Sequence, residues 1–332
     1  MSLDKKILFF ARDPGGASPL VSFISSFTSA KVYAQDYAIE IFKNNNIPYQ
    51  SISNIEDLLP KLKNFKLLVT GTSYLSNSDK ELWLEAKKLN IQSVAYFDHW
   101  MNFKRFFHTD KNIEIFPNFI IVIDEIAKAG ILKNNPTCTS KILTLGSAFL
   151  EEAIKQKTSV QVEKNTYLYA AEKIKGYEIE KEYGINEFTQ FELLLNTLEK
   201  SNKKTKLFFR PHPKHNKDKI EKYLSTLQTT NCTIALDTSS NKYPLLNSID
   251  ALFGINSMVL AEGLMLGKKV CSIGNNLKKL SSFELINKKF IFSSKTKQDL
   301  KDFINGKVHI NPYDISHIKN SKRTIINFLE SL

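Results

Sequence analysis

The stretch KILFFARDPGGASPL (residues 6–20) decides the fold at the start of the chain. An apolar run at residues 6–11, typical of a buried β-strand, is followed directly by Arg12, Asp13, a proline and two glycines. The next segment, PLVSFISSF, is helix-like. A strand, a tight turn and a helix in this order form the first unit of an open parallel sheet. The turn lacks both the Gly-x-Gly-x-x-Gly spacing of a dinucleotide site and the lysine of a Walker motif, so neither site is predicted.

Short apolar runs alternate with amphipathic segments along the rest of the chain. Further strands of the first half are predicted at residues 31–34, 66–71, 92–97 and 118–124. After the polar stretch KQKTSVQVEKN (155–165) the pattern restarts with TYLYAAE (166–172). Strands that alternate with helices indicate a parallel α/β fold. We therefore predict two tandem Rossmann-like, doubly wound domains with a cleft between them, which is the GT-B architecture.

The polar stretch sets the predicted domain boundaries. The N-terminal domain is expected to span residues 1–158 and the C-terminal domain residues 159–315. Residues 316–332 are expected to form a helix that packs back on the first domain. In open α/β sheets, ligands bind outside the carboxyl ends of the strands. Each candidate motif below follows a predicted strand, as this rule requires.

The composition is ordinary for a soluble globular protein, with 42% hydrophobic and 24% charged residues. No apolar run reaches about 18 residues, so no transmembrane helix is expected. The apolar run near the N-terminus is short and is followed by charge, which argues against a signal peptide. Cys138, Cys232 and Cys271 are isolated and odd in number, which favours reduced thiols over disulfides or a zinc site. We therefore expect a cytoplasmic protein.

The formal net charge is +12, mostly from lysines scattered among asparagines. One interpretation is a solvated, lysine-rich surface. The other is attraction to an anionic partner: a nucleotide-activated substrate, or the anionic inner face of the cytoplasmic membrane, where the protein would bind peripherally. Nucleic acid is not expected as a partner, because no recognition helix, zinc finger or aromatic-basic motif is visible. The oligomeric state is not predicted.

The motif FFRPHPKHN in the second half places Arg210 and His212 at the end of a predicted strand. Two prolines stiffen the turn, which holds His212 in a defined position. Histidine and arginine side chains can donate hydrogen bonds to phosphate oxygens as negative charge builds on a leaving group. A turn in which His212 only bonds a carbonyl is the alternative. His215, on the polar side of the loop, is expected to be a solvated neighbour.

A second motif, FGINSMVLAEGLMLGKKV, follows some 45 residues later. Gly254, Asn256 and Ser257 come after an apolar run and before a helix. A serine there caps the helix, and the free amides and dipole of the helix start can bind a phosphate. Glu262, within that helix, could accept hydrogen bonds from ribose hydroxyls, or be an exposed helix residue. Glu172, after the first strand of this domain, is either a base or ribose contact or a loop glutamate.

The pairing of RPHP with GINSMVLAEGLMLGKKV resembles the donor-binding half of bacterial GT-B glycosyltransferases, especially the sialyltransferase, polysialyltransferase and capsule-type transferases. The resemblance implies that His212 binds the donor phosphate and that Ser257 helps to hold it. It also implies that Asp13 of RDPGG is the general base, although these families typically have two acidic residues before the glycine where this chain has Arg12, Asp13 and Pro14. The C-terminal domain would then bind the nucleotide sugar and the N-terminal domain the acceptor.

Asp13 suits the role of base on chemical grounds as well. An inverting transfer needs a carboxylate that removes the proton of the acceptor hydroxyl while the leaving phosphate is stabilised. Gly15 and Gly16 would let an acceptor approach the backbone closely. The alternative is that Asp13 caps the following helix and that the glycines only make the turn.

A further cluster, YFDHWMNFKRF (96–106), follows the strand at 92–97. Asp98 and His99 are the alternative candidates for the general base. Aromatic and basic residues in one loop suit sugar stacking and the binding of an acceptor carboxylate or phosphate. The opposing interpretation places Trp100 in the core and Arg105 in solvent. The full set of expected acceptor-binding residues is Arg12, Gly15, Gly16, Thr72, Trp100 and Arg105.

No metal site is predicted, because neither an Asp-x-Asp motif nor a His/Cys cluster with ligand spacing is present. We therefore expect a metal-independent inverting glycosyltransferase that needs no cofactor besides its nucleotide-sugar substrate. The favoured donor is a CMP-linked nonulosonic acid, and the acceptor a glycan or lipid-linked glycan of bacterial surface polysaccharide. The alternatives are a UDP-sugar transferase, a non-hydrolysing UDP-GlcNAc 2-epimerase, a CDP-alditol phosphotransferase of the teichoic type, or a non-enzymatic binder of nucleotide sugars or polyanions.

Overall fold

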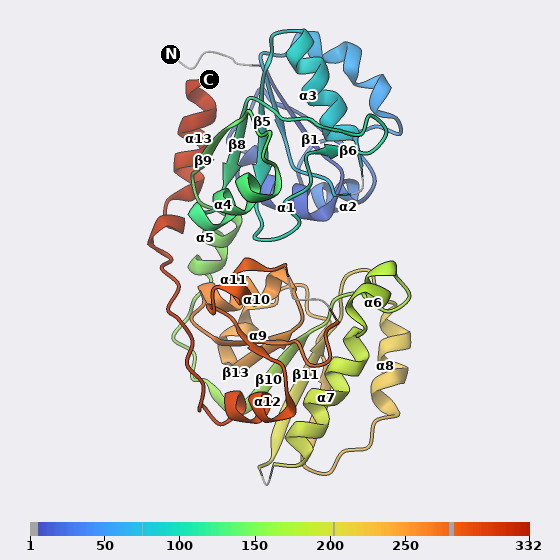
Figure 1. The fold of residues 1–332 in the computed structure, drawn as a ribbon, viewed down its shortest axis with the longest axis vertical. Coiled ribbons are helices and arrows are strands. Elements are labelled where there is room, and N and C mark those ends of the chain that lie inside the picture. The colour runs from blue at the N-terminus through green and yellow to red at the C-terminus, as the bar shows by residue number, and fades with distance from the viewer. Residues whose placement is uncertain (1–5, 75, 202, 279–281) are drawn as a thin grey trace. The chain divides into compact units, whose positions relative to one another are not determined.

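The computed structural model describes residues 6–74, 76–201, 203–278 and 282–332. The chain divides into two compact units. Unit 1 comprises Met1–Glu152 with Ile315–Leu332, and unit 2 comprises Ala153–Asp314. Each unit is a parallel sheet with helices packed on it (Figure 1). The predicted fold class, two tandem Rossmann-like α/β domains, is therefore confirmed.

The sheet of unit 1 has the strand order β3-β2-β1-β4-β5-β8-β9, and all its neighbouring strands are parallel. Chain order reverses beside β1, since β2 lies on one side of it and β4 on the other. The strands are β1 (Ile7–Ala11), β2 (Lys31–Ala34), β3 (Gln50–Ser51), β4 (Leu67–Thr70), β5 (Gln92–Phe97), β8 (Phe119–Val122) and β9 (Lys141–Thr144). A separate antiparallel pair consists of β6 (Phe107–His108) and β7 (Ile113–Glu114).

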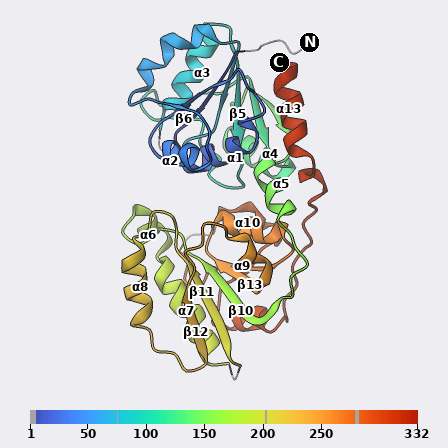
Figure 2. The same ribbon diagram turned by 180° about the vertical axis from the view of Figure 1, so that it is seen from behind.

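Helices cover both faces of this sheet (Figures 1 and 2). Alternate residues of β1, such as Phe9, pack with Phe23 of α1 and with Ile325 and Leu329 of α13. On the opposite face, the indole Nε1 of Trp83 in α3 donates to Thr70 Oγ1 at 3.0 Å. The helices are α1 (Pro14–Ile24), α2 (Tyr37–Asn44), α3 (Ser78–Lys88), α4 (Glu125–Asn134), α5 (Ala148–Lys155) and α13 (Ser321–Ser331), with the short 3-10 helices η1 (Ile55–Asp57), η2 (Leu59–Asn64) and η3 (Ser316–Ile318).

The sheet of unit 2 has the order β12-β11-β10-β13-β14-β15, again with parallel neighbours throughout. Here chain order reverses beside β10, which lies between β11 and β13. The strands are β10 (Glu163–Ala170), β11 (Thr205–Arg210), β12 (Cys232–Leu236), β13 (Ile249–Gly254), β14 (Lys269–Ile273) and β15 (Phe292–Ser294).

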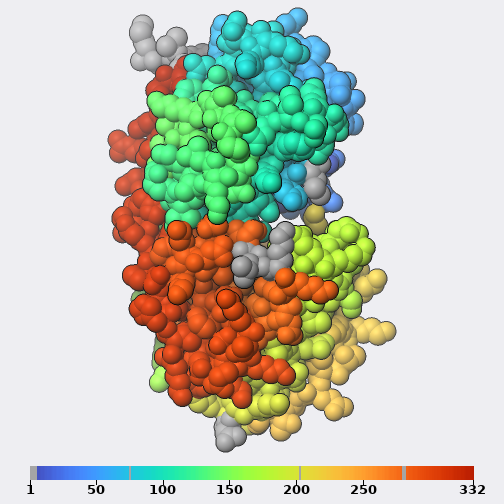
Figure 3. Space-filling view, viewed as in Figure 1, coloured from blue at the N-terminus to red at the C-terminus, as the bar shows by residue number. Residues whose placement is uncertain are grey.

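One face of the unit 2 sheet packs against α7, α8 and α12, where Phe191, Ile220 and Leu300 join the core. Gly263 of α10 lies against Leu252 of β13 on the other face, since a Cβ there would be 2.4 Å from a methyl carbon of Leu252. The segments after β13, orange to red in Figure 3, form much of one surface of this unit. The helices are α6 (Glu178–Tyr183), α7 (Glu187–Glu199), α8 (Lys217–Ser225), α9 (Tyr243–Ser248), α10 (Met258–Met265), α11 (Glu284–Asn287) and α12 (Lys297–Ile304).

Candidate functional site

The strand register of unit 2 aligns the ends of its three central strands. Ala170 of β10 pairs with Arg210 of β11 on one side and with Gly254 of β13 on the other. Two residues beyond this common level, each strand is followed by a polar residue: Glu172, His212 and Asn256. This edge is where the strand order reverses, the position at which open α/β sheets bind ligands. The register thus brings together three residues that the sequence predicted from separate motifs.

His212 lies in the turn after β11, between two prolines. Its Nδ1 accepts a hydrogen bond from the backbone amide of Lys214 at 3.1 Å. A backbone amide can only donate, so the ring proton of neutral His212 is on Nε2. Burial lowers the pKa of His212 to about 4, helped by the neighbouring His215 and by the positive charges of Lys214 and Lys173. Near neutral pH the side chain is therefore an uncharged donor at Nε2.

His215 is not the solvated neighbour that the sequence suggested. Its side chain is 5% exposed, and its Nε2 lies 2.9 Å from Glu187 Oε1. Glu187 is the first residue of α7 and its side chain is 1% exposed. Sequence reasoning missed Glu187 because it stands 25 positions before His212 and next to an ordinary helix cap. The cap residue Asn186, which accepts hydrogen bonds from Phe188 and Thr189, is the only local signal.

Ser257 occupies the N-cap of α10, and its Oγ accepts from the Val259 amide at 3.3 Å. The amide of the preceding residue, Asn256, donates to Glu172 Oε1. Gly254 lies so close to β10 that a Cβ would be 3.0 Å from the carbonyl oxygen of Ala170. The predicted helix start is therefore present. The carboxyl group of Glu172 is already hydrogen-bonded to the backbone amide of Asn256, just before this helix start.

Burial raises the pKa of Glu172 to about 7, and the negative charge of Glu187 adds to the rise. The hydrogen bond from Asn256 opposes it. Glu172 is therefore about half protonated at neutral pH, whereas an ordinary glutamate is fully ionised. Perturbed carboxyl groups of this kind are concentrated at functional sites.

Two of the expected donor-binding residues are engaged inside unit 2. Arg210 forms an ion pair with Asp237 at 2.5 Å and donates to the carbonyl of Ser239 at 3.1 Å. Glu262, 1% exposed, accepts hydrogen bonds from Lys242 Nζ at 2.8 Å and from a tyrosine hydroxyl, that of Tyr243, at 2.9 Å. A ribose or a phosphate would have to displace these partners, so donor binding by Arg210 and Glu262 stays a prediction without support from their placement.

In unit 1, Asp13 stands at the N-cap position of α1, but its carboxylate makes no capping hydrogen bond. Oδ2 accepts from the amide of Tyr74 at 3.1 Å, and Oδ1 lies 3.3 Å from Arg12 Nη1. Arg12 also pairs with Asp36 at 2.6 Å. The helix-cap alternative for this side chain is therefore wrong. Tyr74, in the loop after β4, is the contact that the sequence did not predict.

The two glycines of the first turn differ in their surroundings. A Cβ on Gly15 would meet no atom within 4 Å, as expected for open space above the turn. Gly16 instead packs against Gly71, since a Cβ on Gly71 would be 2.5 Å from the Cα of Gly16. The role of Gly16 here is backbone packing between α1 and the end of β4, which corrects the expectation that it leaves room for an acceptor.

Arg105 is buried, contrary to the solvated alternative. It is 8% exposed, its Nη1 donates to the carbonyl and hydroxyl oxygens of Thr72 at 3.2 and 3.3 Å, and its guanidinium lies 5.5 Å from the centre of the Phe97 ring. Its Nε has no hydrogen-bond partner within the described part of the chain. Burial lowers the pKa of Arg105, and the charges of Asp13 and Asp79 oppose that shift. Arg105 and Asp13 are thus electrostatic neighbours.

Trp100 belongs to the core. It is 0% exposed, and its Nε1 donates to Asp124 at 2.8 Å, so stacking on an acceptor sugar is excluded for this side chain as placed. His99 accepts from the Trp100 amide through Nδ1 at 2.9 Å, and burial together with Arg105 lowers the pKa of His99 to about 3. A ring with that pKa is a weak base near pH 7. Asp98, 6% exposed after β5, stays the other alternative base.

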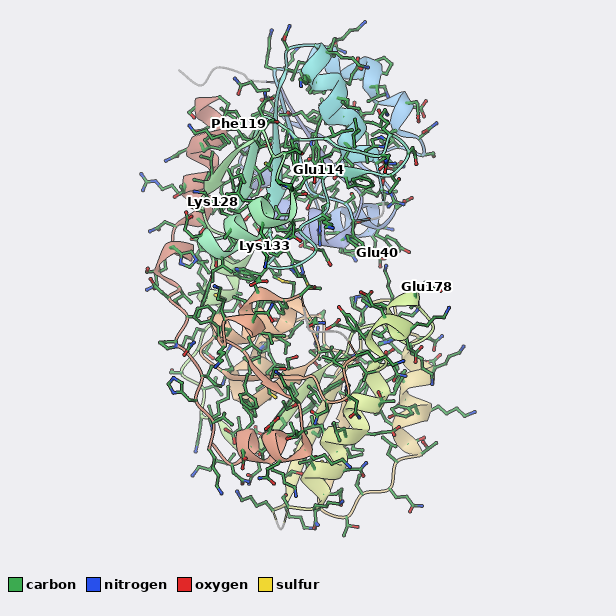
Figure 4. All side chains as sticks on the ribbon, in the orientation of Figure 1. Glu40, Glu114, Phe119, Lys128, Lys133 and Glu178 are labelled. Carbon is green, nitrogen blue, oxygen red and sulfur yellow. The ribbon has the colours of Figure 1, made fainter. Side chains whose placement is uncertain are left out.

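Within the described ranges, no group of three or more His, Cys, Asp or Glu side chains is placed to hold a metal ion. None of the helices in the same ranges is both long and apolar enough to span a membrane. Basic and acidic side chains share the surface: Lys128 and Lys133 lie on α4, and Glu178 lies on α6 (Figure 4). Some of these charges form short-range pairs, such as Lys181 with Glu178 at 2.9 Å.

No protein-family model matches the sequence, and a search of curated proteins finds no match. Solved structures, in contrast, match over almost the whole chain. The UDP-GlcNAc 2-epimerase of Methanocaldococcus jannaschii is 14% identical with a TM-score of 0.68, covering 98% of this chain and 100% of its own. The Neisseria meningitidis UDP-GlcNAc 2-epimerase, solved bound to UDP-GlcNAc, is 12% identical with the same TM-score and coverage. MurG of Acinetobacter baumannii is 9% identical with a TM-score of 0.58, covering 99% of this chain and 100% of its own.

The chain has the GT-B fold. At these identities the likeness shows the fold alone, and none of the three structures is named as a sialyltransferase. The resemblance of the His-Pro and Ser motifs to that group therefore stays a prediction, as does the CMP-linked donor.

Proposed function

We propose that this protein is an enzyme of nucleotide-activated sugars and that its substrate is a UDP-sugar. The observation that carries the proposal is the register of unit 2, which sets Glu172, His212 and Asn256 at one level beyond three neighbouring strands. The names of the two epimerases with similar folds support UDP-sugars over the CMP-sugar expected from the motifs.

The chemistry of this edge suits a diphosphate. The first amides of α10 carry partial positive charge and can bind phosphate oxygens. His212 adds an uncharged N–H donor at Nε2. Glu172, partly protonated, presents a carboxyl group that repels an anion only when it is ionised. When the bond between the sugar and the diphosphate breaks, the added negative charge falls on oxygens that such donors stabilise.

Glycosyl transfer to a hydroxyl acceptor is the first candidate reaction. In unit 1, the carboxylate of Asp13 does not cap α1. It accepts hydrogen bonds from the backbone amide of Tyr74 and from the guanidinium of Arg12. A carboxylate of this kind can accept the acceptor proton. Asp98 is the alternative base. We propose a glycan or lipid-linked glycan as the acceptor.

Epimerisation of a UDP-sugar is the second candidate, favoured by the higher TM-scores to the two epimerases, 0.68 against 0.58 for MurG. Moving a proton at a sugar carbon needs several acid and base groups. Unit 1 offers one buried carboxyl group beyond those the sequence suggested, because Asp79 of α3 adds to Asp13 and Asp98.

A donor panel tests the proposal. The protein is incubated with UDP-, GDP- and CMP-linked sugars and a CDP-alditol, with and without a mixture of glycan acceptors, and products are followed by NMR. Release of UDP that depends on acceptor establishes a transferase, and inversion at a sugar carbon without acceptor establishes an epimerase. Turnover of the CMP-sugar or CDP-alditol with none of any UDP-sugar would overturn the proposed donor.

A further inference from the structure

Glu187 connects three separate parts of unit 2. Its Oε2 accepts hydrogen bonds from the backbone amides of Ile174 and Lys175 at 3.1 and 2.8 Å, in the loop after β10. Its Oε1 lies 2.9 Å from Nε2 of His215, in the loop after β11. Although burial opposes ionisation, the hydrogen bonds from His215 and from backbone amides hold the pKa of Glu187 below its ordinary value. A buried, ionised carboxylate thus ties the two loops to the start of α7.

The hydrogen bonds determine the protonation of both histidine rings. Nδ1 of His215 accepts from the backbone amide of His212 at 3.0 Å, so its proton is on Nε2 and is donated to Glu187. The carbonyl of His212 accepts from the amide of His215 at 2.9 Å. Nδ1 of His212 accepts from the amide of Lys214, which leaves the Nε2 proton of His212 for an external partner. Each ring nitrogen of His212 and His215 therefore has one defined role as donor or acceptor.

Packing reinforces the arrangement. The ring of His215 lies 6.1 Å from that of Phe188, and the rings of the two histidines are 6.3 Å apart and nearly perpendicular. Pro211 and Pro213 restrict the backbone on either side of His212. His215 itself is only 5% exposed, so it does not offer an accessible face to a ligand.

We propose that Glu187 and His215 are positioning residues that hold the 211–215 turn so that His212 points its Nε2–H donor at the phosphate of the substrate. The inference rests on the proposed function for the identity of the ligand, but the arrangement of the turn can be measured without one. Residues that hydrogen-bond near a ligand-binding histidine without touching the ligand fix the tautomer and the orientation of its ring.

Glu187→Gln tests the pair with almost no change in shape. In either orientation the amide creates a conflict: its NH2 group meets either the Nε2–H of His215 or the two backbone amides. The matched control is Glu180→Gln, because Glu180 also bonds a backbone amide of the same loop, that of Gly176 at 2.7 Å, and the cap residue Asn186, but does not contact His215. His215→Phe is the second variant, since it keeps a ring against Phe188 and removes both hydrogen bonds.

Two readouts separate positioning from a general structural role. Long-range proton–nitrogen NMR of the histidine rings should show the Nε2–H tautomer for His212 in the wild type and in Glu180→Gln, and a mixture of tautomers in Glu187→Gln and His215→Phe. With the UDP-sugar, kcat should fall about 10- to 100-fold in the latter two, while KM changes less than about threefold, because misplacing a group by about 1 Å costs up to a hundredfold.

An unchanged His212 tautomer together with unchanged kcat in both Glu187→Gln and His215→Phe would overturn the inference. If Glu187→Gln does not fold, His215→Phe alone decides, because it leaves Glu187 bonded to its two backbone amides. Loss of the tautomer in a protein that turns over no nucleotide sugar would refute the proposed function and would still support the positioning pair.

Discussion

The carboxyl group of Glu172 accepts a hydrogen bond from the backbone amide of Asn256, directly before the N-cap of α10. A phosphate bound at this helix start would lie beside a group whose pKa burial raises to about 7. Below pH 7 the group is neutral, and above pH 7 it carries a charge that repels the phosphate. His212, with a pKa of about 4, and Glu187, with a lowered pKa, do not change charge in this range.

Affinity for a UDP-sugar should therefore fall about tenfold between pH 6 and pH 8. A UDP-sugar is the suitable ligand because its diphosphate keeps the same charge over this range. Isothermal titration calorimetry measures the dissociation constant, and Glu172→Gln should remove the dependence. Wild-type affinity that is constant or rises with pH would contradict the position assigned to Glu172.

His212→Ala removes the proposed phosphate donor. Loss of one donor to a developing charge typically costs 100- to 1,000-fold in kcat, and we expect a fall of about that size with the UDP-sugar. His309→Ala is the control, since His309 is an exposed histidine of the same unit. Steady-state kinetics measures both, and equal rates for the two variants would count against His212.

Asp13→Asn tests the base in unit 1. Asparagine keeps an oxygen that can accept from the Tyr74 amide but cannot take a proton, so kcat of a transferase should fall by about 100-fold or more. The dissociation constant for the UDP-sugar should stay close to the wild-type value. Asp36→Asn controls for the loss of a charge beside Arg12. A kcat near wild type for Asp13→Asn, with a large loss for Asp98→Asn, would transfer the role to Asp98.

Gly71→Ala should destabilise unit 1, because the new Cβ would be 2.5 Å from the Cα of Gly16 and 2.7 Å from its carbonyl carbon and oxygen. Overpacking against backbone costs about 1–3 kcal/mol of unfolding free energy. Gly15→Ala, whose Cβ enters open space inside α1, should be neutral or stabilising by up to about 1 kcal/mol. Urea denaturation measures the difference, and equal midpoints for the two variants would refute the proposed packing role.

The sequence was sufficient for the fold class because strand and helix periodicities are local. The runs at 31–34 and 92–97 coincide with β2 and β5, and the polar turns after β1, β11 and β13 mark the carboxyl ends of strands. The motifs in the same turns predicted Asp13, His212 and Ser257 as site residues. Local pattern sufficed wherever the residue type and its neighbours in sequence determine the structure.

Long-range partners could not be predicted in this way. Nothing near Glu187 in sequence indicates that it bonds His215, and nothing near Glu262 indicates Lys242 and Tyr243. The burial of Trp100 and Arg105 depends on how the loop after β5 packs. Aromatic and basic residues in one loop suggest an exposed binding surface. Here Trp100 and Arg105 are buried instead, and Arg105 donates a hydrogen bond to the carbonyl of Thr72.

The central claim is that unit 2 binds the diphosphate of a UDP-sugar at the edge where β10, β11 and β13 end. A crystal structure of the complex with UDP tests it most directly. The diphosphate oxygens should lie within hydrogen-bond distance of His212 Nε2 and of the first backbone amides of α10. UDP bound away from both groups, or absent from the crystal at millimolar concentration, would contradict the claim.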